Sequence, residues 1–178
     1  MARPSLLSIL EQRWSPREFD LSHTLDEDEI SVLLEAARWA PSAGNSQPWA
    51  FHAVGRRASG WDQIVECLAA SSRTWASTAA LLVVNICHSR VEGTDWEYSE
   101  FAGYDLGQAV AHMTIQAQSM GLSCRQFRAF DLDGLTDLLE VPDHWTIMSM
   151  TAIGRAAADA RRGPGADVRD PSVTWPRE

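Results

Sequence analysis

The chain has 178 residues, of which 45% are hydrophobic and 22% charged, and its formal net charge at pH 7 is −9. These values are typical of a globular protein with a sizeable core, and we expect residues 1–178 to form a single domain. The acidic balance argues against general binding to nucleic acid or to an anionic membrane surface, because both need a basic face.

Three cysteines, Cys67, Cys87 and Cys124, are widely separated in the chain and odd in number. This pattern predicts neither a disulfide framework nor a CxxC pair, and it favours a reducing compartment. The N-terminus lacks a basic region followed by a long apolar run, and the apolar run at 79–84 is too short to span a bilayer. We therefore expect a cytoplasmic protein with no membrane partner.

The first elements expected along the chain are two helices. Residues 4–12 predict a short helix with leucines on one face. Thr24 and Glu27 have the spacing of a capping box and predict the start of a longer helix, whose apolar residues keep to one face. Pro41 ends this helix, because proline lacks the N–H and disfavours helical geometry in the residue before it.

Strands and helices then alternate through the middle of the chain. Residues 49–54 predict a strand, and residues 61–68 predict a helix with one apolar stripe. The continuous apolar run at 79–87 is typical of a buried central strand. The longest predicted helix covers about residues 96–120, where apolar residues again share one face.

The last third of the chain predicts a strand at 122–127, a helix capped by Asp131, and a final strand at 145–154. From residue 155 the composition shifts towards Ala, Arg, Gly, Pro and Asp. This shift predicts an extended arm over residues 155–178 rather than an independent domain.

The loop at 40–49 reads Ala-Pro-Ser-Ala-Gly-Asn-Ser-Gln-Pro-Trp. Ser42, Asn45 and Gln47 offer hydroxyl and amide groups that both donate and accept hydrogen bonds, and the glycine lets a ligand approach the backbone closely. This inventory suits the polar edge of a heterocycle. The alternative is an ordinary polar turn in which Ser and Asn bond their own backbone.

The segment at 13–19 reads Arg-Trp-Ser-Pro-Arg-Glu-Phe. Pro16 prevents a continuous helix here, so the guanidinium groups of Arg13 and Arg17 can converge on one anion. Arginine grips phosphate well through paired hydrogen bonds. The alternative is a solvated helix end with two surface arginines.

Together the two motifs resemble those of the nitroreductase-like flavoproteins, which carry Arg-x-Ser-x-Arg-x-Phe, an amphipathic helix, and then Ala-Pro-Ser-x-x-Asn-x-Gln-Pro-Trp. The resemblance implies an α+β fold with a central mixed sheet flanked by helices, an extended C-terminal arm, and a homodimer that binds FMN at the subunit interface. The segment at 125–129 departs from the family pattern, which has a proline and small or acidic residues where it passes the flavin.

The resemblance also implies which residues contact the cofactor. The arginine segment and a basic pair in the C-terminal arm would hold the phosphate, and the polar loop and a later strand would face the ring. The implied cofactor-binding residues are Arg13, Trp14, Ser15, Arg17, Pro41, Ser42, Asn45, Gln47, Gln126, Phe127, Arg161 and Arg162.

The activity implied is that of an oxidoreductase in which FMN takes a hydride from NADH or NADPH and then reduces a nitroaromatic, quinone or similar small substrate. This chemistry needs no catalytic side chain from the protein. Two alternatives remain open. The flavin could serve a specialised dehydrogenation or dehalogenation of a small natural product, or the protein could bind FMN without turnover.

Other chemistries lack their motifs. The five histidines are scattered without the spacing of metal ligands, so we expect no metal site. The sequence contains no GxSxG elbow, no P-loop and no GxGxxG after a strand, which argues against a serine hydrolase of that type, a P-loop NTPase and a Rossmann domain.

Overall fold

A computed structural model describes residues 5–160 of the chain. The fold is α+β and contains a single four-stranded sheet within these residues. In chain order the elements are α1 (Ser8–Gln12), α2 (Glu27–Arg38), a 3-10 turn (Ala43–Asn45), β1 (Trp49–Gly55), α3 (Trp61–Glu66), α4 (Ala70–Ala76), β2 (Leu81–His88), α5 (Ala102–Ser119), β3 (Ser123–Phe127), α6 (Leu132–Leu138) and β4 (Trp145–Gly154).

The strands lie in the order β1-β2-β4-β3, and each neighbouring pair is antiparallel. The expected mixed sheet is therefore wrong for the described residues. β2 and β3 do run in the same direction, as a strand–helix–strand crossover through α5 requires, but β4 lies between them and pairs with both. Because β4 lies between β2 and β3, each of these two strands forms an antiparallel pair with β4 instead of a parallel pair with the other.

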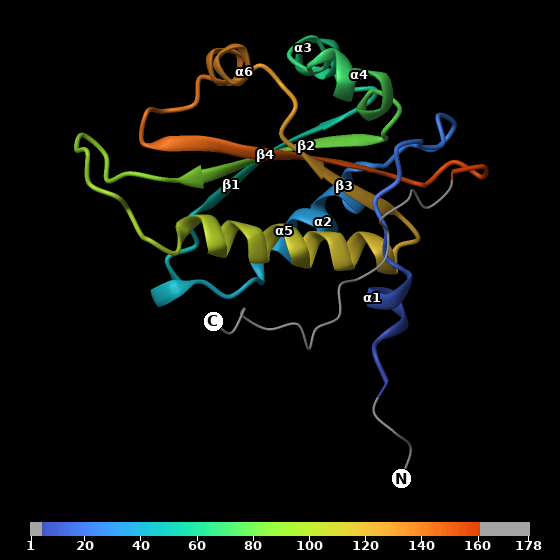
Figure 1. Ribbon diagram of the computed structural model, residues 1–178, viewed down its shortest axis with the longest axis horizontal. Coiled ribbons are helices and arrows are strands. Elements are labelled where there is room, and N and C mark those ends of the chain that lie inside the picture. The colour runs from blue at the N-terminus through green and yellow to red at the C-terminus, as the bar shows by residue number, and fades with distance from the viewer. Residues whose placement is uncertain (1–4, 161–178) are drawn as a thin grey trace, which may run out of the picture.

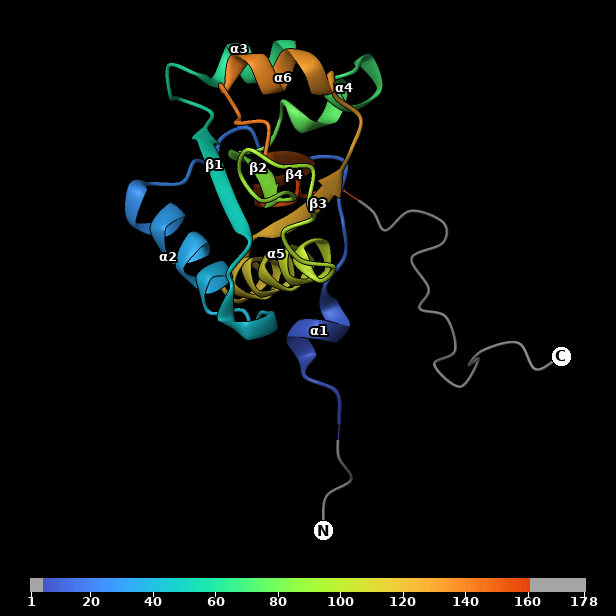
Figure 2. The same cartoon turned by 90° about the vertical axis from the view of Figure 1, so that its left-hand side faces the viewer.

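Helices cover both faces of the sheet (Figures 1 and 2). α2 and α5 lie against one face, and α3, α4 and α6 lie against the other. β2 is buried from Leu81 to Cys87, and its side chains alternate between two separate apolar clusters. Leu82 and Val84 face the three short helices, whereas Leu81 and Val83 face α2 and α5. The continuous apolar run of β2 is thus explained by the helices that cover both faces of this strand.

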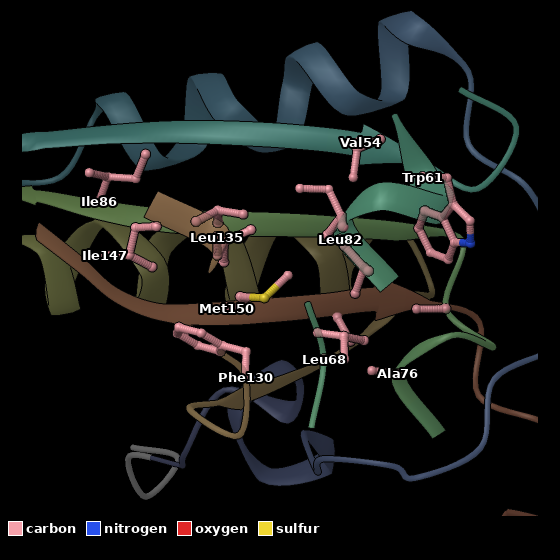
Figure 3. Packing of buried hydrophobic residues seen from close by; sticks show 14 of the residues in the cluster. Val54, Trp61, Leu68, Ala76, Leu82, Ile86, Phe130, Leu135, Ile147 and Met150 are labelled. Atoms are coloured by element: carbon pink, nitrogen blue, oxygen red, sulfur yellow. The ribbon is translucent and has the colours of Figure 1, made fainter. Parts of the chain in front are cut away.

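The cluster beneath the short helices includes Leu68, Leu135, Ile147 and Met150, each at most 2% exposed. Figure 3 shows these side chains gathered around the middle strands. These side chains pack α3, α4 and α6 onto the face of the sheet opposite α5 and so stabilise the sheet.

Several boundaries differ from the sequence prediction. α1 begins at Ser8, and α2 is capped by Asp26 rather than Thr24. The Asp26 carboxylate accepts from Glu29 N at 2.8 Å, while Glu29 Oε2 accepts from Asp26 N at 3.0 Å. The sequence contains two overlapping boxes, and the structure uses the second one, two residues later.

α5 begins at Ala102 rather than near residue 96. The chain before it folds back on itself: Val91 N donates to Trp96 O at 2.8 Å, and Tyr98 N donates to Ser89 O at 3.1 Å. These cross-loop bonds satisfy backbone groups that a longer helix would have used. α4 was not predicted at all.

The beginning of the C-terminal arm lies beside the arginine segment. Asp20 N donates to Arg155 O at 2.9 Å, and Ala157 N donates to Glu18 O at 3.0 Å. The rest of the predicted arm lies outside the described residues. Between residues 5 and 160, no helix is both long enough and apolar enough to cross a bilayer.

Candidate functional site

A hollow of about 760 Å³ lies along the outer side of α5, where α1, β3 and β4 also meet. Arg13 and Ser15 line it from the N-terminal segment, and Gln126 and Ser149 line it from the sheet. We call this hollow the α5 cavity. It brings together one predicted phosphate-binding arginine, its neighbouring hydroxyl and one predicted ring-facing amide.

The α5 wall of this cavity is built largely from small residues. Gly103, Gly107 and Ala111 are exposed and one helical turn apart, so they share one face of the helix. A Cβ atom at Gly107 would meet no neighbouring atom within 4 Å. Leu106 and Val110 are buried beside this face and give the wall an apolar base. The wall therefore offers open space for a flat ligand.

The floor of the cavity is polar. Gln126 Nε2 donates to Thr114 Oγ1 at 2.8 Å, and the Thr114 hydroxyl donates to Val110 O at 2.8 Å. Behind Ser149, the fully buried Asn85 donates through Nδ2 to Ser149 Oγ at 3.0 Å. Sequence reasoning identified only Gln126 here. The signal for Asn85 was a single amide within an otherwise apolar strand.

The arginine segment does not place both arginines in the cavity. Arg13 lines it, and its Nη1 lies 3.4 Å from Ser15 Oγ. Pro16 is buried and Arg17 is exposed, and Arg17 is absent from the cavity lining. Arg17 lies close enough to Arg125 to lower the pKa of that side chain, an effect second to burial. Arg17 thus stands beside β3 at the edge of the site.

The polar loop is docked on a different side of α5. The buried Asp105 accepts from Ala43 N at 2.9 Å, and Gln108 Nε2 donates to Pro41 O at 3.3 Å. These bonds fix the loop to the N-terminal half of α5. Neither Pro41 nor any other residue of the loop lines the α5 cavity.

Within the loop, local hydrogen bonds fix the backbone. Ser42 Oγ accepts from Gln47 N at 3.0 Å, as the polar-turn alternative describes, and Gln47 Nε2 donates to Asn45 Oδ1 at 3.3 Å. Asn45 and Gln47 have φ values of 55° and 47°, which residues other than glycine rarely adopt. Both side chains are exposed. The loop therefore presents its amides outward from a fixed backbone.

The remaining predicted site residues are scattered. Trp14 is half-buried and does not line the cavity. Phe127 follows Gln126 on β3 and so points to the opposite face, where its ring meets Trp75 at a centroid distance of 5.0 Å. Arg161 and Arg162 lie outside the described residues.

Cys124 lies behind the site but has no nucleophilic character. Burial raises the pKa of its thiol to about 12, although a hydrogen bond with Thr114 and the charge of Arg13 act in the other direction. The thiol is therefore neutral at physiological pH. Across residues 5–160, no three His, Cys, Asp or Glu side chains are grouped so that they could hold a metal ion.

The chain is similar to several known proteins. Residues 10–85 match the model of the Nitroreductase family. Protein DrgA from Synechocystis sp. is 27% identical over 84% of this chain and 83% of its own length. The 5,6-dimethylbenzimidazole synthase of Rhodospirillum rubrum is 27% identical over 85% of this chain and 82% of its own length.

Among solved structures, an oxidoreductase containing FMN is 27% identical and superposes with a TM-score of 0.80, covering 88% of this chain and 80% of that chain. The fold and the site define an α+β protein with a basic, polar-floored cavity along its longest helix. Residues 10–85 are thus similar to the Nitroreductase family, and the described fold is similar to that of the solved oxidoreductase containing FMN.

Proposed function

We propose that this protein is an FMN-dependent oxidoreductase that uses NADH or NADPH to reduce nitroaromatic, quinone or similar small substrates, and that it works as a homodimer. The observation that carries this proposal is the α5 cavity, which combines a basic end, a polar floor and an open wall of small residues. These three features together suit a phosphorylated, flat heterocycle. The oxidoreductase containing FMN supports the choice of cofactor.

The basic end suits the phosphate. Arg13 and Ser15 already face the cavity, and Arg17 stands at its edge. Guanidinium and hydroxyl donors would bind the phosphate oxygens through charge-assisted hydrogen bonds. Arg161 and Arg162 would supply a further contact from the arm, as the family resemblance implies.

The polar floor suits the edge of the ring. Bound FMN supplies the capacity to accept a hydride and to donate electrons. Gln126 and the hydroxyls of Thr114 and Ser149 would orient the ring through hydrogen bonds, while Leu106 and Val110 would exclude water beneath it. Donors held near the place where negative charge develops would also stabilise the reduced state.

A second subunit would complete the site. Ser42 and Asn45 lie on the loop docked at another side of α5, so they cannot face the cavity of their own chain without moving the loop. In a dimer across the exposed face of α5, Ser42 and Asn45 of the partner subunit would supply these contacts. Apolar side chains around the cavity, Leu10, Ile115 and Met148, are each about 40% exposed and would be buried by a partner.

Gly107→Arg is expected to keep each chain folded but to abolish the dimer and FMN binding together. The position has room for a side chain within one chain, and replacing glycine inside a helix favours the helix. A charged side chain would meet the partner and fill the α5 cavity. Sedimentation velocity measures the oligomeric state, circular dichroism measures the fold, and flavin absorbance measures the bound FMN. Gly107→Ala is the matched control, and a flavin-loaded Gly107→Arg dimer would contradict the interface.

The purified protein is expected to be yellow and to release about one FMN per subunit on heating, the stoichiometry of a single site in each chain. Its absorbance near the flavin band should bleach under NADH or NADPH without oxygen and return when a quinone is added. The absorption spectrum and an anaerobic titration measure both steps. A colourless protein that cannot be loaded with FMN would contradict the proposal.

A second candidate is a specialised flavin reaction on a small natural product, and the similarity to 5,6-dimethylbenzimidazole synthase favours keeping it. A substrate screen that includes nitroaromatics, quinones, halogenated aromatics and reduced flavin with oxygen separates the two. A loaded dimer that oxidises neither NADH nor NADPH would instead favour an FMN-binding protein without turnover.

A further inference from the structure

Arg125 lies at the edge of the sheet beside the arginine segment. We infer that Arg125 is a positioning residue that holds Ser15, and with it Arg13 and Arg17, in the geometry that binds the phosphate of FMN. This inference rests on the proposed function and deepens it. Arg125 belongs to the segment at 125–129, where the sequence departs from the family pattern.

The contact that carries the inference is a hydrogen bond over a long sequence separation. Arg125 Nη1 donates to the carbonyl oxygen of Ser15 at 2.8 Å, and the bonded residues are 110 positions apart. Ser15 stands between the two arginines, so this one bond fixes the backbone at the centre of the motif. Pro16 follows and has no N–H with which the backbone could be tied down locally.

The Arg125 side chain is itself held firmly. Its guanidinium carbon lies 5.1 Å from the centre of the Trp75 ring, a cation–π geometry. Trp75 is packed edge-on against Phe127, so the platform belongs to the core beneath α4. Within the described part of the chain, the buried Nε atom of Arg125 has no hydrogen-bond partner. The orientation of the Arg125 guanidinium group is therefore explained by the hydrogen bond from Nη1 to the carbonyl oxygen of Ser15.

The charges around Ser15 also support a role of Arg125 in phosphate binding. Burial lowers the pKa of Arg125, and the nearby charge of Arg17 lowers it further. In residues 5–160, no carboxylate forms an ion pair with Arg13, Arg17 or Arg125. Arg17 and Arg125 thus lie close to each other, and neither forms an ion pair with a carboxylate of these residues. A bound dianionic phosphate would relieve the repulsion between them.

A change at Arg125 should affect the binding of FMN and of riboflavin differently. Riboflavin has the ring of FMN but no phosphate, so a residue that positions the phosphate-binding segment should affect FMN and spare riboflavin. A residue that only stabilises the fold should affect both equally. The ratio of the two dissociation constants is therefore the deciding quantity, and it does not depend on turnover.

The experiment titrates flavin-free wild type, Arg125→Met and Arg125→Lys with FMN and with riboflavin, using quenching of flavin fluorescence. Arg125→Met keeps an unbranched, flexible side chain and removes the donor, and we expect FMN binding to weaken about tenfold, the effect of losing one charge-assisted hydrogen bond, with riboflavin binding changed by less than about twofold. Arg125→Lys keeps a cationic donor and should recover most of the FMN affinity.

Arg56→Met is the matched control. Arg56 also donates to backbone carbonyls, to Thr78 O at 2.8 Å and to Leu21 O at 2.7 Å, but it does not bond the arginine segment. It should lower the melting temperature without changing the ratio of FMN to riboflavin affinity. Equal weakening of both flavins in Arg125→Met, or unchanged FMN binding, would overturn the positioning role. A wild type that binds neither flavin would overturn the proposed function and this inference with it.

Discussion

Replacing Arg13 and Arg17 together by alanine is expected to weaken FMN binding by about a hundredfold or more, because each lost guanidinium–phosphate hydrogen bond removes about 1.5–3 kcal/mol. The chain should remain folded. Both side chains are exposed, and Arg13 contacts Ser15 through a hydrogen bond of 3.4 Å. Titration of the flavin-free protein with FMN measures the affinity, and thermal unfolding measures the stability.

The single variants rank the two arginines. Arg13 lines the α5 cavity whereas Arg17 stands at its edge, so Arg13→Ala should account for more of the loss. Arg57→Ala is the control, because Arg57 is also exposed but lies on the turn after β1. An unchanged FMN content in the double variant would rule out this segment as the phosphate site.

Asp105→Ala is expected to lower the free energy of unfolding by about 2–3 kcal/mol, because it leaves two half-buried donors without their acceptor. Asp105 is only 2% exposed. Its carboxylate accepts from Ala43 N at 2.9 Å and from Gln108 Nε2 at 3.2 Å, so it fastens the polar loop to α5. Urea unfolding measures the loss of stability, and amide exchange at Ala43 reports whether the loop is released.

The same variant tests the shared site. If the loop completes the partner's cavity, releasing it should also weaken FMN binding. Asp105→Asn is the matched control, since one oxygen can still accept from Ala43 N while the amide group can no longer accept from Gln108. It should fall between wild type and Asp105→Ala in both measurements. Equal stability of all three proteins would mean that Asp105 does not anchor the loop.

Elements set by local patterns were predicted well. The final strand runs from Trp145 to Gly154 as expected, and the apolar run at 79–87 forms the buried β2. Asp131 caps α6 through Gly134 N, also as expected. These features depend on spacing and on neighbours a few residues away, which a sequence displays directly.

Other features depended on partners far along the chain. α4 carries no clear amphipathic pattern, since Ser72 and Ala76 are its buried residues, and it is held by tertiary packing instead. The expected mixed sheet was wrong because nothing in the sequence of β2 or β3 specifies that β4 will lie between them. Pairing is decided by which strands the whole chain brings together.

The sequence by itself determined the two motifs, the helix between them and the class of fold, because each is written in residues that are close together along the chain. Only the tertiary structure decided that the motifs lie on different sides of α5, with the loop held to Asp105 and Ser15 held to Arg125. These bonds join residues 62 and 110 positions apart. No local pattern encodes such a contact, because its geometry exists only after the core has packed.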